Sequence, residues 1–489
     1  MTSTNAYDRS IVWLRRDLRL RDNTALYQAA KRSVRICLAF VLDPELLRSQ
    51  RVGAPIVQFF FTALDALRGE LRQLESDLVI LEGAFDRELI ALVHNVGAQA
   101  VFFNEDYEPS AVTRDDSVTM SLKAAGIAVH RFVDHVYFNA EELRGASGEP
   151  YRIFTPYKRK WLELQRFSQK APVSSEPLRR GQLLLATELP QSQAVPAPER
   201  YGHQSSSNFP RGSEAGARSA LRQFLTKGGP AESYPVDRNF PSRNGTSHLS
   251  AHLRAGTIGV RTCIAAAERA GNQRGKRASL DVWISELIWR DFYQQVLKNF
   301  PQVATEPFRH EAAGLEYLNR EEEFAAWCTA RTGYPIVDAA MTQLNRYGWM
   351  HNRLRMVVAS FLSKHLLVDY RKGERYFEQH LCDADMAANN GGWQWAGSTG
   401  TDAVPYFRIF NPTLQSRHFD PQGAFIRSML PGLRQVSDEF IHEPWKLPPL
   451  LAREAGCEIG KDYPFPIVDH ESARKRAIAT YASAMAVKK

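Results

Sequence analysis

The sequence predicts two architectures in one chain: an N-terminal α/β domain with a doubly wound parallel sheet, and a larger all-α domain after it. Three observations lead to this prediction. Short apolar runs alternate with helical patterns over about the first 135 residues, and helical patterns alone continue after residue 218. A stretch rich in Ser, Pro and Gly separates the two parts. The length of 489 residues also exceeds that of one typical domain.

Five apolar runs are the expected strands of the first domain, which we place at residues 8–135. They cover residues 10–14, 34–42, 78–81, 100–104 and 127–133. Because helical patterns separate these runs, the sheet should be parallel and covered on both faces. No GxGxxG follows the first strand, so the usual dinucleotide fingerprint is absent.

The rest of the chain divides into a linker and a helical domain. Residues 136–217 show little periodicity apart from an ordered-looking island at 151–161, and we interpret them as an interdomain linker. Residues 218–475 form the predicted helical domain. The expected helices, the first of which begins one residue before this domain, cover residues 217–225, 260–270, 280–299, 320–330, 337–347, 353–365 and 370–381.

Bulk composition excludes several classes of protein. Apolar residues at 44% and charged residues at 24% are typical of a globular domain, and no apolar run approaches a membrane span. The polar N-terminus gives no secretory signal. Five scattered cysteines without CxxC spacing argue against disulfides and a metal site, and favour a reducing cytoplasm. The net charge of +8 is compatible with a polyanionic partner.

Residues 383–412 contain the most unusual mixture of side chains in the chain. Two acids, two adjacent asparagines, a Gly-Gly step and two tryptophans one residue apart occur within them. Amides and hydroxyls among flat rings suit one wall of a pocket for a large planar ligand. An ordinary Gly/Asn-rich loop between helices is the competing interpretation.

Three further blocks carry chemistry. Hydroxyls in residues 246–250 could donate to phosphate oxygens at a helix start, or could simply cap that helix. In residues 283–290, Glu286 and Arg290 are four apart on a helix with two tryptophans, although such a pair is often only a solvated ion pair. In residues 348–356, Asn352 and Met356 share one helix face, although a methionine there is often plain core.

With these blocks in this order, the sequence closely resembles the photolyase/cryptochrome family, and within it the class I cyclobutane pyrimidine dimer photolyases. The resemblance extends nearly from end to end. The matching motifs are residues 13–23, 332–341, 348–356, 383–403 and 405–412. It implies light-driven repair of cyclobutane pyrimidine dimers in UV-damaged DNA, by electron transfer from excited FADH⁻ to a lesion flipped out of the duplex.

The resemblance also implies which residues hold FAD in the helical domain. Asn389 matches the position facing flavin N5, where a neutral amide adds no charge beside the reduced anion. Arg355 and Asp383 would pair beside the isoalloxazine, and Asp385 would reach the ribityl–adenine side. The remaining cofactor-binding positions are Tyr234, Thr246, Ser247, Leu249, Ser250, Trp283 and Arg290.

A second set of positions matches the lesion pocket. Trp289 and Trp395 would stack on the flipped dimer, and Glu286 would hydrogen-bond its edges and stabilise its radical. Asn352 and Met356 stand where the (6-4) photolyases carry histidines, so repair of (6-4) lesions is not expected. The cations expected to meet DNA phosphates, each of which could also be an ordinary surface charge, are Arg238, Arg353, Arg408, Lys158 and Lys160.

The electron-transfer residues depart from the family. Trp393 matches the tryptophan nearest the flavin, but Tyr370 stands where a second tryptophan is usual, and Tyr317 aligns with the outer position. Because tyrosine oxidation is coupled to loss of the phenolic proton, we expect slow photoreduction or another route, through Trp395 or Trp327.

A second, antenna chromophore is expected in the N-terminal domain. The segment around Asp106 lacks the Asn-Glu pair of folate-binding relatives and resembles the deazaflavin-binding type. A deazaflavin is therefore favoured over a folate, and flavin mononucleotide or an empty site stay open. We expect a monomer that repairs DNA, and the alternative is a cryptochrome-type blue-light photoreceptor. A redox flavoprotein is disfavoured, since no nicotinamide fingerprint is present.

Overall fold

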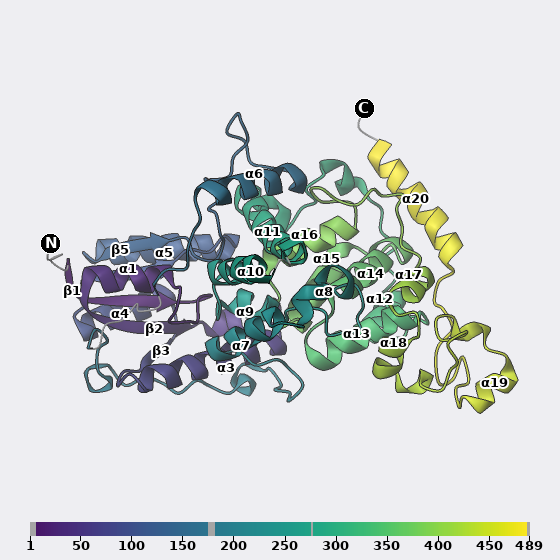
Figure 1. The fold of residues 1–489 in the computed structure, drawn as a ribbon, viewed down its shortest axis with the longest axis horizontal. Helices are drawn as coiled ribbons and strands as arrows, with labels where there is room; N and C mark the ends of the chain where they lie inside the picture. Colours follow the sequence, from purple (N-terminus) through teal and green to yellow (C-terminus); the bar gives the residue numbers. More distant parts are fainter. Residues whose placement is uncertain (1–5, 175–180, 275–276, 487–489) are drawn as a thin grey trace. The chain divides into compact units, whose positions relative to one another are not determined.

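The computed structural model of the chain describes residues 6–174, 181–274 and 277–486 (Figure 1). The chain forms two compact units, each assembled from segments distant in sequence. The first contains Met1–Glu232, Ser247–Pro301 and Cys382–Asp385, and the second contains Ser233–Thr246, Gln302–Leu381 and Met386–Lys489. The domain boundaries at 8–135, 136–217 and 218–475 stay a prediction.

The first unit contains the predicted five-stranded sheet. Its strands are β1 (Tyr7–Leu14), β2 (Ser33–Leu42), β3 (Leu78–Glu82), β4 (Ala100–Asn104) and β5 (Ala128–Phe132). They lie in the order β3-β2-β1-β4-β5, and every neighbouring pair is parallel. The doubly wound fold is therefore confirmed. Its strand order reverses between β1 and β4, and ligands of such sheets bind at the carboxyl ends of the strands beside that point.

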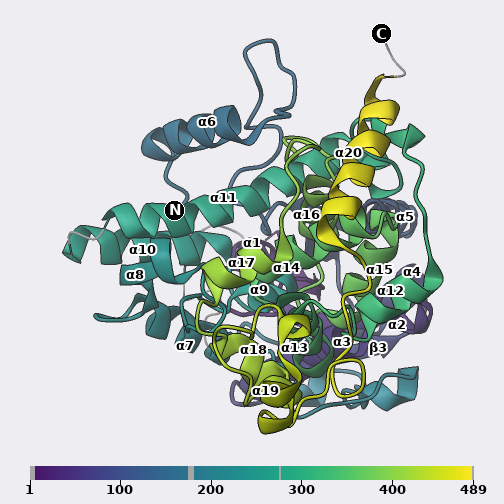
Figure 2. The same ribbon diagram turned by 90° about the vertical axis from the view of Figure 1, so that its right-hand side faces the viewer.

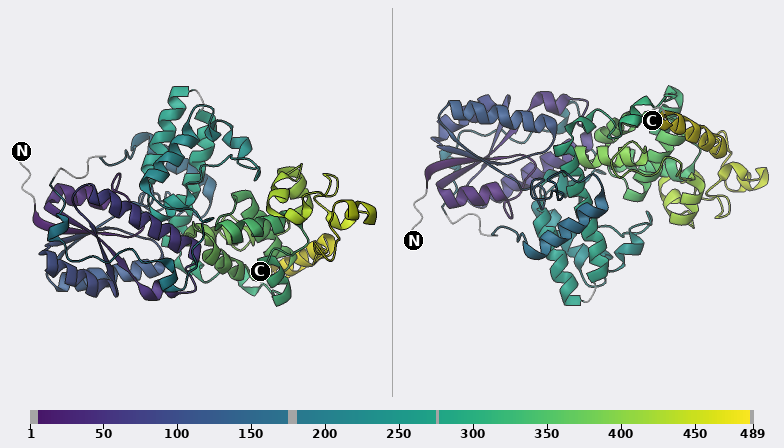
Figure 3. Two further views of the ribbon diagram at one scale, coloured as in Figure 1. Left: turned by 90° about the horizontal axis from the view of Figure 1, so that it is seen from below. Right: turned by 90° about the horizontal axis from the view of Figure 1, so that it is seen from above.

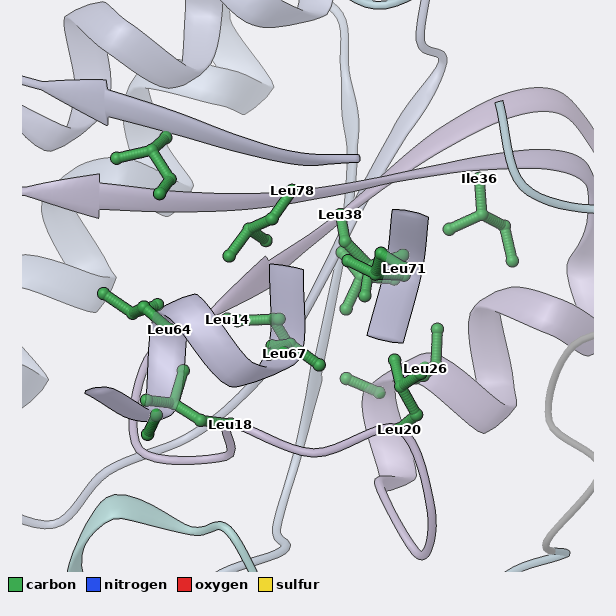
Figure 4. Close-up of a cluster of buried hydrophobic side chains, with 14 of the residues drawn as sticks. Leu14, Leu18, Leu20, Leu26, Ile36, Leu38, Leu64, Leu67, Leu71 and Leu78 are labelled. Atoms are coloured by element: carbon green, nitrogen blue, oxygen red, sulfur yellow. The ribbon is translucent and has the colours of Figure 1, made fainter. Parts of the chain in front are cut away.

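Helices cover both faces of this sheet, as Figure 3 also shows. Helices α1 (Thr24–Arg32) and α3 (Ala54–Arg72) pack on one face with Val12 and Leu14 of β1. Figure 4 shows this core, which is made largely of leucines. Helices α4 (Phe85–Val96) and α5 (Pro109–Ala124) pack on the other face with Ile11 and Trp13. Alternate residues of β1 thus enter two separate cores, as the pleat requires.

Of the other helices of the first unit, α2 lies between β2 and β3 in sequence, and the rest follow the last strand. Helix α6 lies inside the predicted linker, so part of that segment is helical. These helices are α2 (Pro44–Arg48), α6 (Phe154–Phe167), α7 (Glu214–Leu225), α9 (Ser250–Ala255), α10 (Val260–Arg274) and α11 (Arg277–Asn299), and α8 (Pro230–Asp237) continues into the second unit.

The described part of the second unit contains helices and no strand. They are α12 (Glu321–Cys328), α13 (Pro335–Tyr347), α14 (Asn352–Ser360), α15 (Tyr370–His380), α16 (Met386–Ala396), α17 (Pro412–Phe419), α18 (Ala424–Met429), α19 (Pro449–Glu454) and α20 (His470–Ala486). Figure 2 shows α20, which packs on the turn His310–Gly314 and on the π-helical segment Phe361–His365. Every predicted helix is present, with ends shifted by a few residues. No described helix is both long and apolar enough to cross a membrane.

Candidate functional site

Helix α11 carries four of the predicted site residues. Trp283 is buried, packs on Phe224 with ring centroids 5.0 Å apart, and donates from its indole nitrogen to the Ser247 hydroxyl at 3.3 Å. The structure thus brings together two residues that the sequence assigned to the cofactor from different motifs. Arg290, also on α11, donates to the main-chain carbonyl of His135.

Trp289 has a rigid aromatic support. Its ring is parallel to that of Phe154 on α6, with centroids 3.5 Å apart and an interplanar angle of 9°. Phe292 meets the same indole edge-on at 5.7 Å, and Tyr293 lies against it at 5.5 Å. Because Glu286 precedes Trp289 by three residues on one helix, both lie on the same side of α11. Both are half-buried, which suits groups that must reach a ligand.

The hydroxyl-rich segment before α9 does not cap that helix. The N-cap residue is Leu249, it is buried, and no side chain caps the helix start. The interpretation of these hydroxyls as ordinary caps of α9 is therefore wrong. His248 has a positive φ of 52°, so the backbone turns sharply between the half-buried Ser247 and the exposed Ser250.

The two acids of residues 383–385 are buried and belong to the first unit. The Asp385 carboxylate accepts hydrogen bonds from the Gln294 amide at 2.9 and 3.1 Å, and pairs with the Arg16 guanidinium. Arg355 belongs to the second unit and donates from Nε to the Met350 carbonyl at 2.9 Å. Its predicted pairing with Asp383 would join the two units and stays a prediction.

Asn389, Trp393 and Trp395 lie on α16, so residues 386–396 of the stretch 383–412 are helical and are not part of a loop. The Asn389 amide donates to the Glu374 carbonyl at 2.9 Å, and the Asn390 amide donates to the Glu374 carboxyl at 3.0 Å. Burial raises the pKa of Glu374 to about 8, so this carboxyl group is largely protonated at neutral pH.

Trp393 is buried in an aromatic cluster of the second unit. Phe377 meets it at 5.0 Å and Trp327 at 6.1 Å, both edge-on. A Cβ at Gly373 would stand 2.2 Å from the indole, so glycine is required there. Trp327 in turn contacts Tyr376 at 5.5 Å. Trp393, Trp327 and Tyr376 thus form a series of contacting rings, and electron transfer along it stays a prediction.

The two tyrosines predicted for electron transfer also lie in the second unit. Tyr370 is the first residue of α15 and is buried, and Tyr317 packs at the edge of the cluster around Tyr481. Burial raises the pKa of both phenols well above the usual value. Because oxidation of tyrosine is coupled to loss of the phenolic proton, burial of these phenols bears on that coupling, and the route of photoreduction stays a prediction.

Helix α14 begins at Asn352, which is exposed, and places Met356 one turn later. Arg353 contacts the Met356 sulfur at 3.7 Å, lies over the Phe419 ring at 4.4 Å and donates to the Asn239 side chain at 2.6 Å. The predicted phosphate-binding Arg353 is thus held against the predicted lesion residue Met356.

The remaining predicted DNA-binding and cofactor-binding residues differ in their exposure and in their contacts. Arg238 lies over the ring of the buried Tyr234 at 5.2 Å, and Arg408 is exposed. Lys160 pairs with Glu163 at 2.9 Å, three residues along α6. That pair fits an ordinary solvated ion pair. Lys158 on α6 and Thr246 are half-buried.

Sequence reasoning missed three supporting groups: Phe154 beneath Trp289, the carboxyl of Glu374 beside α16, and Arg16 against Asp385. The second arginine of the sequence WLRRD was visible as an unexplained charge directly after a buried strand. Its distant partner was not visible, because nothing in a linear pattern pairs residues 369 positions apart.

Comparisons with known proteins show which family the chain belongs to. Residues 10–177 match the model of the DNA photolyase family, and residues 283–483 match the FAD binding domain of DNA photolyase. A deoxyribodipyrimidine photo-lyase of Salmonella typhimurium is 40% identical over 484 residues, covering 97% of this chain and 98% of that protein. One from Synechococcus is 38% identical, with 96% of each chain covered.

Solved structures share the whole fold. A bacterial class III photolyase from Agrobacterium tumefaciens superimposes with a TM-score of 0.89 at 34% identity, over 99% of each chain. A Synechocystis cryptochrome gives 0.89 at 26% identity, over 97% of this chain and 99% of its own. An archaeal photolyase from Sulfolobus tokodaii, solved with two FAD molecules, gives 0.80 at 31% identity, over 97% of this chain and 100% of its own.

The fold and the end-to-end similarity define a light-driven flavoprotein class, and the chain belongs to the DNA photolyase family. Its activity is that of a deoxyribodipyrimidine photo-lyase, the carbon–carbon lyase that uses light to repair cyclobutane pyrimidine dimers in DNA.

Proposed function

We propose that this activity is carried out by the residues predicted above, with FAD as the cofactor and a flipped pyrimidine dimer as the substrate. The observation that supports this most directly is the paired arrangement on α11. Trp289 is held flat by Phe154, and Glu286 stands one turn away on the same side. A supported aromatic face beside a carboxyl group suits a planar ligand whose edge carries hydrogen-bonding groups.

The hydroxyl and amide side chains at the proposed cofactor site suit the hydrogen-bonding groups of FAD. Ser247 is fixed by the indole of Trp283, and the hydroxyls before α9 are not used as caps, so they can donate to a diphosphate. Asn389 directs its Nδ2 to Glu374, which leaves its side-chain oxygen to accept a hydrogen bond from a reduced flavin ring. When bound in its reduced form, FAD would supply the light-driven, reversible transfer of one electron that splitting of the dimer needs.

The chain's own residues bind and orient the dimer. Trp289 and Trp395 offer faces on which pyrimidine rings stack, which repays part of the cost of unstacking the lesion. Glu286 hydrogen-bonds the pyrimidine edges and stabilises negative charge on the split dimer through a shared proton or N–H bonds. Asn352 and Met356 stand at the positions where the (6-4) photolyases carry histidines, so repair of a (6-4) lesion is not expected.

Surface cations position the DNA and carry no sequence information. Arg353 is suited to this role, because its contacts with Asn239 and the Phe419 ring fix its direction. Arg238 and Arg408 would extend the same basic rim. Affinity for undamaged DNA should therefore fall steeply with salt, while the preference for the dimer should persist.

Blue-light repair of an oligonucleotide with one defined thymine dimer tests the function. We expect repair in the light, none in the dark, and none of a matched (6-4) substrate. Absence of repair with fully reduced flavin bound would overturn the proposal and favour the cryptochrome-type photoreceptor, whose flavin responds to light without restoring DNA. Glu286→Ala is the matched variant, since it removes one lesion contact and leaves Trp289 in place.

For the second chromophore we propose the deazaflavin type, with Asp106 as its acid. Asp106 already accepts from Arg16 and from the main-chain N–H groups of Tyr107 and Glu108. A chromophore would therefore meet an acid that is fixed and ion-paired. Absorbance of the extracted cofactors distinguishes a deazaflavin from a folate, flavin mononucleotide or an empty site. Sedimentation of the holoprotein tests the expected monomer.

A further inference from the structure

Arg16 is a buried guanidinium bound by three carboxylates. Its Nη1 lies 3.2 Å from both oxygens of Asp106 and 2.7 Å from Glu108, and its Nη2 pairs with Asp385. Its Nε donates to the Arg254 carbonyl at 3.3 Å. All the nitrogens of one side chain are thus engaged, and only 13% of that side chain is exposed.

These contacts join parts of the first unit that are far apart in sequence. Arg16 follows β1, and Asp106 and Glu108 follow β4, so the guanidinium stands at the carboxyl ends of the two strands between which the sheet order reverses. Asp385 comes from the short segment Cys382–Asp385. The place where a doubly wound sheet offers a ligand site is therefore tied to a residue proposed to contact FAD.

The charge balance makes Arg16 the central group. Three acids meet two guanidiniums, because Arg254 also lies 3.7 Å from Glu108. Burial opposes ionisation of Asp106, but the charge of Arg16 holds the pKa of Asp106 well below its usual value. His135 supplies no charge at neutral pH, since burial lowers its pKa to about 4. Without Arg16, the carboxylates of Asp106, Glu108 and Asp385 would lose the guanidinium that contacts all three of them.

Asp385 is held from two further directions. The Gln294 amide donates to both of its oxygens, and Arg254 Nε donates to the carbonyl of Ala384 at 2.6 Å. The Asp385 side chain is only 8% exposed. Backbone and side chain of this acid are therefore both fixed, and Arg16 supplies a full positive charge directly to its carboxylate.

We propose that Arg16 is a positioning residue for flavin binding: by pairing with Asp385 it fixes the segment 383–385 and neutralises the acid next to an anionic cofactor. This inference rests on the proposed function only in placing Asp385 on the ribityl–adenine side. An unpaired carboxylate there would repel the diphosphate and release the segment. The same guanidinium binds Asp106, so the proposed antenna acid and the proposed flavin acid share one cation.

The test is dissociation of FAD from purified holoprotein, followed in the dark and without DNA by the fluorescence of released flavin. Arg16→Gln should release FAD about 10- to 100-fold faster, the range typical when a group that orients a direct ligand is lost. Arg16→Lys keeps the positive charge but loses the planar guanidinium with its several N–H donors. Its rate of FAD release should therefore lie between those of the parent protein and Arg16→Gln.

Arg261→Gln is the matched control. Arg261 is another buried guanidinium of the first unit, and it bridges Asp22 at 2.9 Å and Asp134 at 2.6 Å without contacting a proposed cofactor residue. Both glutamine variants should lose thermal stability, because each leaves buried acids uncompensated. Only Arg16→Gln should also accelerate FAD release. Equal release from the two variants would overturn the proposal.

A double-mutant cycle separates action through Asp385 from a general effect. If Arg16 acts through Asp385, then combining Arg16→Gln with Asp385→Asn should release FAD no faster than the worse single variant. Multiplicative rates would overturn the proposal. Failure of dimer repair with FAD firmly bound would instead defeat the proposed function and leave the Arg16 result intact, because FAD release is measured without substrate.

Discussion

Phe154 lies directly beneath Trp289, and this pair gives the sharpest test of the lesion pocket. Trp289→Ala removes the stacking face, and base–aromatic stacking contributes about 1–3 kcal/mol per base. Affinity for a dimer-containing oligonucleotide should therefore fall about 5- to 150-fold. Phe154→Leu keeps the indole but removes its parallel partner at 3.5 Å, a contact worth about 0.5–1.5 kcal/mol. We expect this change to weaken binding about 2- to 13-fold, because stacking on the dimer must then restrict a Trp289 indole that is freer to move.

The assay is fluorescence anisotropy in the dark, with the same labelled oligonucleotide carrying one thymine dimer or none. Undamaged DNA should bind all variants equally, since phosphate contacts are untouched. Phe102→Leu is the matched control, because it removes a ring stacked on Phe132 at 6.3 Å within the sheet core. The reasoning is refuted if Trp289→Ala leaves dimer affinity unchanged, or if damaged and undamaged DNA lose affinity alike.

Three further outcomes are expected. Glu286→Ala should lower the repair yield per absorbed photon about 2- to 13-fold, the effect of one hydrogen bond of about 0.5–1.5 kcal/mol, and an unchanged yield in continuous-light repair would contradict its role. Tyr370→Trp should accelerate flavin photoreduction, whereas Trp327→Phe should slow it; equal fast rates in transient absorption would refute both. Because burial raises the pKa of Glu374 to about 8, the folded state holds its proton more tightly, so stability should fall between pH 4.5 and 8. Glu374→Gln should flatten that decline in thermal unfolding, and an unaltered pH profile would exclude this carboxyl as its source.

The fold was largely predictable because its signals are local. Each strand is a short apolar run, and β1 alternates between two cores, as the pleat requires. Helix α11 could be located from its 3.6-residue periodicity, and that periodicity also placed Glu286 and Trp289 on one side. The sequence of residues 386–396 did not indicate a helix, because adjacent asparagines and glycines are poor helix formers. Burial of Trp393 against Phe377 and Trp327 outweighs that weak local preference.

The supporting groups could not be predicted, for a different physical reason. Phe154 and Trp289 are far apart in sequence, and no periodicity relates an aromatic residue on α6 to one on α11. The raised pKa of Glu374 depends on burial in the folded chain, whereas its sequence context, between Gly373 and Arg375, is that of a surface helix. The supporting contacts thus became visible only in the folded chain, whereas the predicted site residues themselves rest on the family resemblance.

The contact between Arg16 and Asp385 also has a consequence during synthesis of the chain. The two residues are 369 positions apart, and translation at about 5–20 residues per second separates them by about 20–75 s. Over that interval Arg16 can already be neutralised, because Asp106 and Glu108 are made soon after it. The sheet can therefore form early around a satisfied arginine. In the growing chain, Nη2 of Arg16 then stays available until residues 383–385 have been made and Asp385 can pair with it.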